Sequence, residues 1–284
     1  MARDQTAPPF ITFLSDYGHE DEFVGVCHGV IARRCPAARV IDLSHAIPRH
    51  DVRAGASVLC AALPYVPAGV HLAVVDPTVG AVDRSEIGQQ ARRAIALRTA
   101  EEDRLLVGPD NGLLMPAAER FGGAAEAVDI GRSRERLQPV SRTFHGRDIF
   151  APVAAALADG AMLSEVGDPL PAGDLKRQEL PAALVADGAL RTHVLRRDGF
   201  GNLILDAREA QLAAIGARPG DALAVRHAGT AHGALYASTF ADVPAGALLL
   251  YEDAQQMLAL AVNRGSAAEL LGAGRDDELV VRLS

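Results

Sequence analysis

Two carboxylates follow apolar runs in the N-terminal half of the chain, where they are placed to do chemistry. Asp16 follows the run that ends at Ser15, and Asp76 follows the run 70–75. In open α/β sheets ligands bind beyond the carboxyl ends of the strands, so these side chains are candidates for transferring protons or binding hydroxyl groups. Either one could instead cap a helix or close a turn.

His145 lies next to Gly146 in a charged loop that precedes an Ala-rich apolar stretch. An accessible imidazole with a near-neutral pKa is suited to acid or base catalysis, although a lone histidine is more often a structural hydrogen-bonding group. Asn202, at the end of an Asp-Gly-Phe-Gly segment, offers both a donor and an acceptor, which suits the edge of a purine.

An acidic cluster, Glu20 to Glu22, follows Asp16. Three interpretations remain open for it: a solvated start of a helix, oxygen ligands for a metal ion, and an anchor for an ammonium group.

Strand-like and helix-like segments alternate through the first half of the chain. Strand-like runs at 9–15, 40–44, 70–76, 94–98 and 105–112 are interleaved with helical patterns at 23–34, 52–63, 113–121 and 149–157. This alternation predicts βαβ units and an α/β domain with a mostly parallel sheet over residues 1–172.

The C-terminal part has a different pattern. A polar stretch rich in Pro and Gly predicts a linker at 173–184, and short alternating runs separated by Gly, Pro and Asp turns follow it. We therefore expect a smaller antiparallel β-barrel domain over residues 185–284.

Composition excludes several classes of function. The net charge is −8 and only 12 of 284 residues are aromatic, which argues against binding nucleic acid. The single lysine, Lys176, lies in neither a phosphate-binding loop nor a pyridoxal-enzyme context. No apolar run is long enough to span a membrane, and the three cysteines show no zinc-type spacing. We expect a cytoplasmic protein with no membrane partner.

Taken in order, seven segments resemble those of the S-adenosyl-L-methionine (SAM) hydrolases, the hydroxide adenosyltransferases related to SAM-dependent fluorinase and chlorinase. The segments are SDYGHEDEFVG at 15–25, VIDLSHAI at 40–47, DVRAGA at 51–56, VHLAVVDPTVG at 70–80, PDNGLL at 109–114, TFHGRDIFAP at 143–152 and DGFGN at 198–202. The resemblance implies an α/β domain followed by a β-barrel, and a homotrimer with active sites at subunit interfaces. It also implies a reaction in which water attacks the ribose C5′ of SAM to give adenosine and L-methionine, with no cofactor and no metal.

The resemblance also implies site residues. The family's Asp, Arg and His correspond to Asp76, Arg84 and His145 as the catalytic set. The substrate-binding set comprises Asp16 on the ribose diol, Asp21 and Asp198 on the methionine ammonium, Asn202 and Phe240 on adenine, and the backbone around Val262, Asn263 and Arg264 at the purine edge.

Asp76, His145 and Gly146 distinguish the chain from the halogenating relatives, so water is the expected nucleophile. Two departures from the family pattern are Thr78, which replaces a glycine, and the acidic segment 252–256 near the expected methionine carboxylate. These departures motivate one alternative, a non-catalytic protein that binds SAM or adenosine. The acidic residues around Asp16 motivate another, a metal-dependent nucleoside hydrolase.

Overall fold

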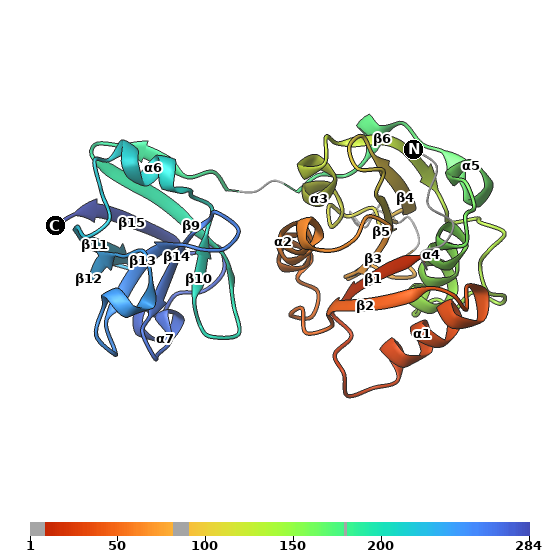
Figure 1. Cartoon of the computed structure of the whole chain (residues 1–284), viewed down its shortest axis with the longest axis horizontal. Coiled ribbons are helices and arrows are strands. Elements are labelled where there is room, and N and C mark those ends of the chain that lie inside the picture. The colour runs from red at the N-terminus through yellow and green to blue at the C-terminus, as the bar shows by residue number, and fades with distance from the viewer. Residues whose placement is uncertain (1–8, 82–90, 179–180) are drawn as a thin grey trace. The chain divides into compact units, whose positions relative to one another are not determined.

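The computed structural model describes residues 9–81, 91–178 and 181–284. The chain divides into two units, Met1–Gln178 and Glu179–Ser284 (Figure 1). Each unit has its own buried apolar clusters, as expected of an independent domain.

The N-terminal unit is built on seven strands. They are β1 (Phe10–Ser15), β2 (Arg39–Ser44), β3 (Val70–Val74), β4 (Ala94–Thr99), β5 (Leu105–Pro109), β6 (Ala124–Asp129) and β7 (Asp168–Pro169). Its helices are α1 (Phe23–Arg34), α2 (Val52–Ala62), α3 (Met115–Arg120), α4 (Ala151–Ala158) and α5 (Leu163–Val166), with short 3₁₀ turns η1 (Leu63–Tyr65) and η4 (Ala172–Asp174) and a π-helical turn η3 (Gly146–Phe150).

The strands form one sheet in the order β2-β1-β3-β5-β4-β6-β7. β2, β1, β3 and β5 are parallel, whereas β4 and β7 run in the opposite direction to their neighbours. The predicted α/β unit with a mostly parallel sheet is confirmed. Because β4 is antiparallel to β5, the start of β4 lies at the same edge of the sheet as the ends of β3 and β5.

Helices cover both faces of this sheet (Figure 1). Phe13 faces one apolar cluster, which contains Cys27 of α1 and most of α4, and the next residue, Leu14, faces a second cluster that contains α2 and α3. Successive side chains on a strand point to opposite faces, so a run of consecutive apolar residues is what a sheet buried on both faces requires. Polar groups that meet a ligand are therefore confined to the edge where the strands end.

The C-terminal unit is a β-barrel. Its strands are β8 (Leu184–Ala186), β9 (Ala189–Arg197), β10 (Leu203–Leu205), β11 (Ala222–His227), β12 (Thr230–Tyr236), β13 (Leu248–Glu252), β14 (Leu258–Val262) and β15 (Glu278–Leu283), with helices α6 (Glu209–Ala214) and α7 (Ala267–Leu271) and a 3₁₀ turn η5 (Phe240–Asp242).

Pairing of β10 with both β14 and β9 closes the sheet into a ring, and β8 adds to β9. The predicted C-terminal β-barrel is confirmed, and its strand pairs are antiparallel except for β12 and β13, which are parallel. The connection 237–247 crosses back before β13 begins, and a crossover of this kind lets two successive strands run in the same direction.

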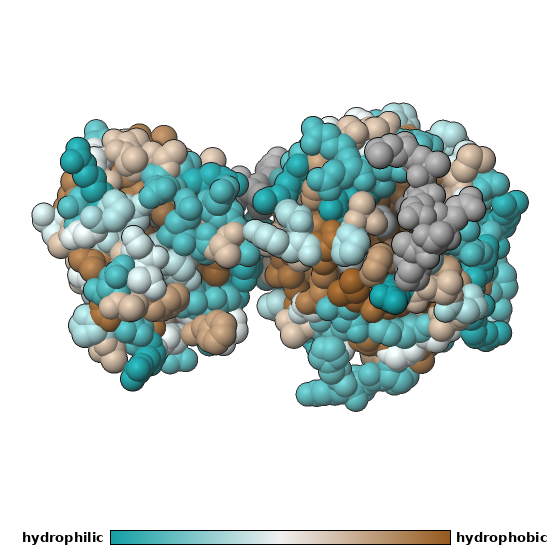
Figure 2. All heavy atoms as spheres, in the orientation of Figure 1, coloured by the Kyte–Doolittle hydropathy of each residue, from teal (hydrophilic) through white to brown (hydrophobic). Residues whose placement is uncertain are grey.

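The surface of each unit is largely hydrophilic in the view of Figure 2, although hydrophobic residues reach the surface near the centre of the N-terminal unit. Two of the exposed large apolar side chains, Phe200 and Phe240, belong to the C-terminal unit. Across the part of the chain that the structure describes, no helix combines the length and hydropathy needed to cross a membrane.

Candidate active site

A cavity of about 350 Å³ lies at the carboxyl ends of β1 and β3, and we call it the N-terminal cavity. Its lining residues are Asp16, Tyr17, Asp21, Phe23, Arg49, His50, Val74, Asp76, Val79, Thr143, Phe144, His145 and Gly146. The fold thus brings together four predicted site residues that are up to 129 positions apart in the sequence, Asp16, Asp21, Asp76 and His145.

Asp76 and His145 are joined by an arginine that the sequence analysis did not select. Arg92 Nε donates to both carboxylate oxygens of Asp76, at 3.1 and 2.9 Å, and its Nη2 also pairs with Asp76. The same Nη2 lies 2.9 Å from Nδ1 of His145. The side chains of Arg92 and Asp76 are only 6% and 5% exposed, so this bidentate pair is held in a dry environment.

The predicted catalytic arginine, Arg84, lies outside the described residues. The signal that identifies Arg92 is its position just before β4. β4 runs antiparallel to β5, so a residue preceding it reaches the sheet edge at which Asp76 follows β3. The number of residues between Asp76 and an arginine does not show that Arg92 lies at this edge of the sheet.

The protonation of His145 follows from this contact. A guanidinium can only donate, so Nδ1 of His145 must accept, and a neutral ring then carries its proton on Nε2. Burial, and next the positive charge of Arg92, lower the pKa of His145 below its ordinary value. The imidazole is therefore neutral at neutral pH.

A π-helical turn places His145. Gly146–Phe150 form this turn directly before α4, and His145 is its N-cap residue. Asp148 is buried, accepts from the backbone N–H of Ser141 at 2.7 Å and pairs with Arg147 at 2.6 Å. π turns inside helices are frequent at functional sites, and here the turn ties the loop 141–145 to the rigid helix that follows.

Aromatic rings that the sequence analysis did not select form an apolar wall of the N-terminal cavity. Tyr17, Phe23 and Phe144 contact one another with ring centroids 5.0–5.9 Å apart. Burial raises the pKa of Tyr17 well above its ordinary value, so this side chain stays a neutral phenol. A Cβ at Gly146 would lie 2.0 Å from the Tyr17 hydroxyl oxygen, so only glycine fits there.

Asp16, at the end of β1, keeps much of its carboxylate available. Its Oδ2 accepts from the backbone N–H of His50 at 2.9 Å, and His50 adopts the left-handed conformation with φ 67°. This contact fixes the carboxylate at the cavity wall, and among the described residues no side chain donates to its other oxygen. A diol can therefore be bound by it.

A second cavity, of about 790 Å³, lies in the C-terminal unit, and we call it the C-terminal cavity. Its lining residues are Arg196, Asp198, Phe200, Asn202, Ile204, Phe240, Tyr251, Asp253, Ala254, Gln255, Val262, Arg264 and Gly265. It contains five of the predicted binding residues: Asp198, Asn202, Phe240, Val262 and Arg264.

Asn202 is 5% exposed, and the nitrogen of its side-chain amide is already hydrogen-bonded. Its Nδ2 donates to Asp198 Oδ2 at 2.8 Å, and its backbone N–H donates to Asp198 Oδ1 at 2.9 Å. This leaves the Asn202 side-chain oxygen as an oriented acceptor, suited to an exocyclic amine. Phe240 packs against Tyr251 with centroids 5.1 Å apart, and burial raises the pKa of Tyr251 to about 12.

The structure places some of the predicted binding residues apart from one another within the chain. Asn263 does not line the C-terminal cavity, and its side chain donates to the Val243 carbonyl at 2.8 Å. The side chain therefore holds the turn after β14, and the role predicted for the backbone at this position stays a prediction. Asp21 and Asp198, both predicted at one ammonium group, line cavities in different units.

The acidic residues around Asp16 give no support to a metal-dependent nucleoside hydrolase. Within the described ranges, Asp16, Glu20, Asp21 and Asp76 do not bring three or more ligand atoms close together. Another set of side chains does so, away from this cavity. Asp76 is instead neutralised by Arg92.

Comparison with known proteins identifies the family. Residues 11–167 match the SAM hydroxide adenosyltransferase N-terminal domain, and residues 192–280 match the C-terminal domain of the same family. The chain belongs to the SAM hydroxide adenosyltransferase family.

Its relatives include enzymes named (R)-S-adenosyl-L-methionine hydrolase. That of Salinispora arenicola is 45% identical over 96% of this chain and 97% of its own length, and that of Thermus thermophilus is 40% identical over 92% and 95%. A fluorinase of Nocardia brasiliensis is 30% identical over 92% of each chain. An uncharacterised conserved protein of Thermotoga maritima has a crystal structure that matches with a TM-score of 0.86 at 35% identity, over 96% of this chain and 99% of that one.

Proposed function

We propose that this family member is a SAM hydrolase, in which water attacks the ribose C5′ of SAM and adenosine and L-methionine are released. The observation that carries the proposal is the buried Asp76–Arg92–His145 network at a cavity that also presents Asp16. The family and the names of its hydrolase relatives support it, and those names point to the (R) epimer of the sulfonium as the substrate.

The reaction is an in-line displacement. A bond forms between the water oxygen and C5′ while the C5′–S bond breaks, and the sulfur keeps the electron pair and leaves as neutral methionine. No acid is needed for this leaving group. The enzyme must hold one water in line with C5′ and remove one proton from it, and correct placement alone can contribute several kcal/mol, on the order of 7.

The hydrogen bonds favour Asp76 as the proton acceptor. Nδ1 of His145 already accepts from Arg92, so the neutral ring presents an N–H at its other nitrogen and orients the water rather than deprotonating it. The Asp76 carboxylate retains lone pairs beyond those that Arg92 occupies, so it takes the proton. Arg92 does not line the N-terminal cavity and acts through the two residues that do.

The two cavities divide substrate binding. Asp16 accepts from the ribose diol at the N-terminal cavity, and the C-terminal cavity supplies Asn202 and Phe240 for adenine. We include in the proposal a homotrimer in which sites form at subunit interfaces, so that cavities from two copies contribute to one site. Light scattering on the active enzyme tests this part, and a fully active monomer would contradict it.

Two further parts complete the proposal. The reaction uses no cofactor and no metal, since the network that handles the water consists of an aspartate, an arginine and a histidine. The enzyme works in the cytoplasm, in keeping with three cysteines that are not joined in disulfides, two of them buried.

The deciding experiment is chromatography of a reaction containing SAM and the protein, with and without chelator and with excess chloride or fluoride. We expect equimolar adenosine and methionine, unchanged by chelator or halide. A 5′-halo-adenosine would overturn the assignment of water as nucleophile. Tight SAM binding without any product would favour the non-catalytic alternative.

A further inference from the structure

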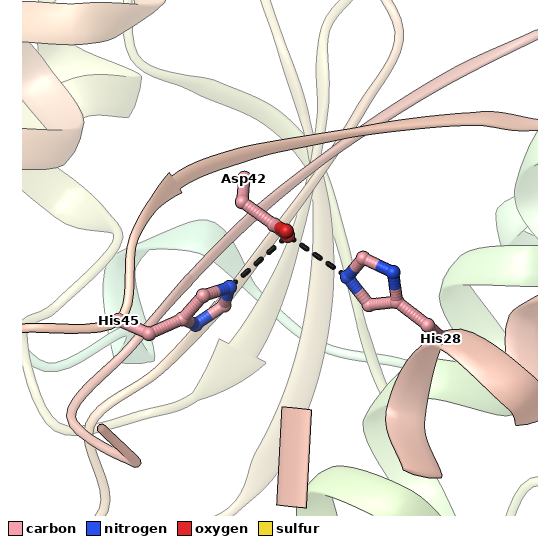
Figure 3. A group of neighbouring side chains, drawn as sticks. All are labelled: His28, Asp42 and His45. Carbon is pink, nitrogen blue, oxygen red and sulfur yellow. Dashed lines mark hydrogen bonds and ion pairs between the residues drawn. The ribbon is translucent and has the colours of Figure 1, made fainter. Parts of the chain in front are cut away.

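Three ligand-type side chains converge outside both cavities. His28 of α1 and Asp42 of β2 meet His45, which follows β2 (Figure 3). Nε2 of His28 lies 2.9 Å from Asp42 Oδ1, and Nε2 of His45 lies 3.0 Å from the same oxygen. Their candidate ligand atoms all lie within 4.8 Å of one another, and none of the three residues lines either cavity.

The orientation of His45 is unusual for a simple hydrogen-bonded cluster. Its side chain is fully buried, yet Nε2 has no hydrogen-bond partner, because Asp42 Oδ1 is near in distance but outside hydrogen-bond geometry. The other ring nitrogen, Nδ1, lies 2.7 Å from Ser15 Oγ. A proton on Nε2 could only make a poorly aligned hydrogen bond to this carboxylate oxygen.

The surroundings favour the opposite tautomer, with the proton on Nδ1. Ser15 Oγ already accepts from the backbone N–H of Tyr17 at 3.3 Å, and it can accept from His45 Nδ1 as well. Nε2 of His45 then presents a lone pair to a carboxylate oxygen 3.0 Å away. Two lone pairs at this distance repel each other unless a cation lies between them.

We propose that His28, Asp42 and His45 bind a divalent first-row transition metal, with Zn²⁺ as the best fit and water completing the shell. Two imidazoles and one carboxylate are typical zinc ligands, whereas calcium and magnesium prefer oxygen. Tetrahedral Zn²⁺ at its usual bond lengths holds ligand atoms about 3.3 Å apart. The two imidazole nitrogens lie 2.9 and 3.0 Å from Asp42 Oδ1, so small side-chain movements would admit the ion. The side chains of His28 and Asp42 are 35% and 39% exposed, which leaves a path for the ion.

The Ser15–His45 contact gives the site a second feature of metal centres. A histidine that binds a metal through one nitrogen usually donates from the other to an oxygen that fixes its orientation. That oxygen here belongs to the residue before Asp16, and the backbone N–H of Gly18 donates to the His45 carbonyl at 2.8 Å. The metal would therefore steady the loop 15–18, which carries Asp16 and Tyr17 into the N-terminal cavity, without touching the reacting groups.

The test uses untagged full-length protein stripped with chelator and titrated with Zn²⁺ by calorimetry. A parallel titration with Co²⁺ is followed by visible absorption, which is intense for tetrahedral sites. We expect one equivalent to bind tightly and the thermal unfolding midpoint to rise, since a ligand that binds only the folded state stabilises it. His28→Gln can still donate to Asp42 but offers no imidazole, so it should weaken Zn²⁺ binding at least about 10-fold.

Two variants complete the design. Asp42→Asn should lose the tetrahedral Co²⁺ spectrum, whereas His232→Gln, a histidine of β12 in the other unit, should bind as the wild type does. Failure of the wild type to bind one equivalent, or wild-type affinity in both His28→Gln and Asp42→Asn, would overturn the proposal. The inference is independent of the hydrolase proposal, because metal binding and adenosine release are measured separately.

Discussion

At the N-terminal cavity Asp76 is buried and paired with Arg92 behind it, whereas the C-terminal cavity presents exposed rings and an amide that is already hydrogen-bonded on one side. Asp76 and Arg92 are almost fully enclosed, but Phe200 and Phe240 are 84% and 39% exposed. Groups that handle a nucleophile act best when they are oriented before the substrate arrives. Groups that recognise a base need not be oriented beforehand, because the ligand or a neighbouring copy of the chain can complete their contacts. The difference predicts that changes in the first cavity alter turnover and changes in the second alter binding.

The largest expected effect is that of Asp76→Asn. Removing the proton acceptor should lower kcat by about 10³-fold with a much smaller change in KM. Steady-state kinetics of adenosine release measures both values, and Asp159→Asn on the surface serves as the control. Equal losses in KM and kcat would break the contrast between the cavities.

Arg92→Lys should come next, with kcat lower by about 10²-fold, since a lysine cannot hold Asp76 bidentately and reach His145 as well. Arg84→Lys is the matched comparison, because Arg84 stays the arginine predicted from the resemblance, and a loss of kcat there would add it to the catalytic set. Because Arg92 acts through its neighbours, added guanidinium ion should restore part of the activity of Arg92→Ala. Loss of activity in the Arg84 variant with retention in the Arg92 variant would reverse the assignment.

Gly146→Ala tests how tightly the N-terminal cavity is packed. The new Cβ would meet the Tyr17 hydroxyl, and the free energy of unfolding should fall by about 1–3 kcal/mol. Tyr17→Phe removes that oxygen and should recover part of the loss in the double variant. Chemical denaturation of the four proteins of this cycle gives the coupling, and additive effects would show that the two residues do not clash.

Asn202→Ala tests the C-terminal cavity. We expect KM to rise about 10-fold with kcat nearly unchanged, because the lost amide acts on bound adenine before and during the reaction. Asn263→Ala is the comparison, since its amide holds Val243 outside the cavity. It should lower the unfolding midpoint while leaving KM within about 2-fold. A larger KM change at Asn263 would contradict this division.

The smallest effect is a pH dependence. The pKa of His145 lies below its ordinary 6.5, and the neutral ring is the form that accepts from Arg92. Turnover should therefore be flat above pH 6.5 and fall only at lower pH, as the ring takes up a proton. Stability follows the same sign, because the unfolded chain binds more protons than the folded one in that range. A pH profile of kcat that already falls above pH 7 as pH is lowered would contradict the neutral ring.

Much of the fold could be predicted from local patterns. The apolar runs of β1 and β3 fix a sheet buried on both faces, and their length leaves Asp16 and Asp76 at the strand ends. The reversal of β4 and the parallel pair β12–β13 could not be predicted, because strand direction depends on which edge the chain returns to. Arg92 was missed for the same reason, since its partner is set by the direction of β4.

The sequence by itself determined the family, the two-unit organisation of motifs and most of the side chains that line the two cavities, because residue types and their order are properties of the chain. Only the tertiary structure decided which arginine joins Asp76 to His145 and that the Asn263 side chain holds a turn. It also decided that His28 and His45 both contact the same oxygen of Asp42. Hydrogen bonds and ion pairs of this kind act over about 3 Å, and sequence distance does not measure that separation.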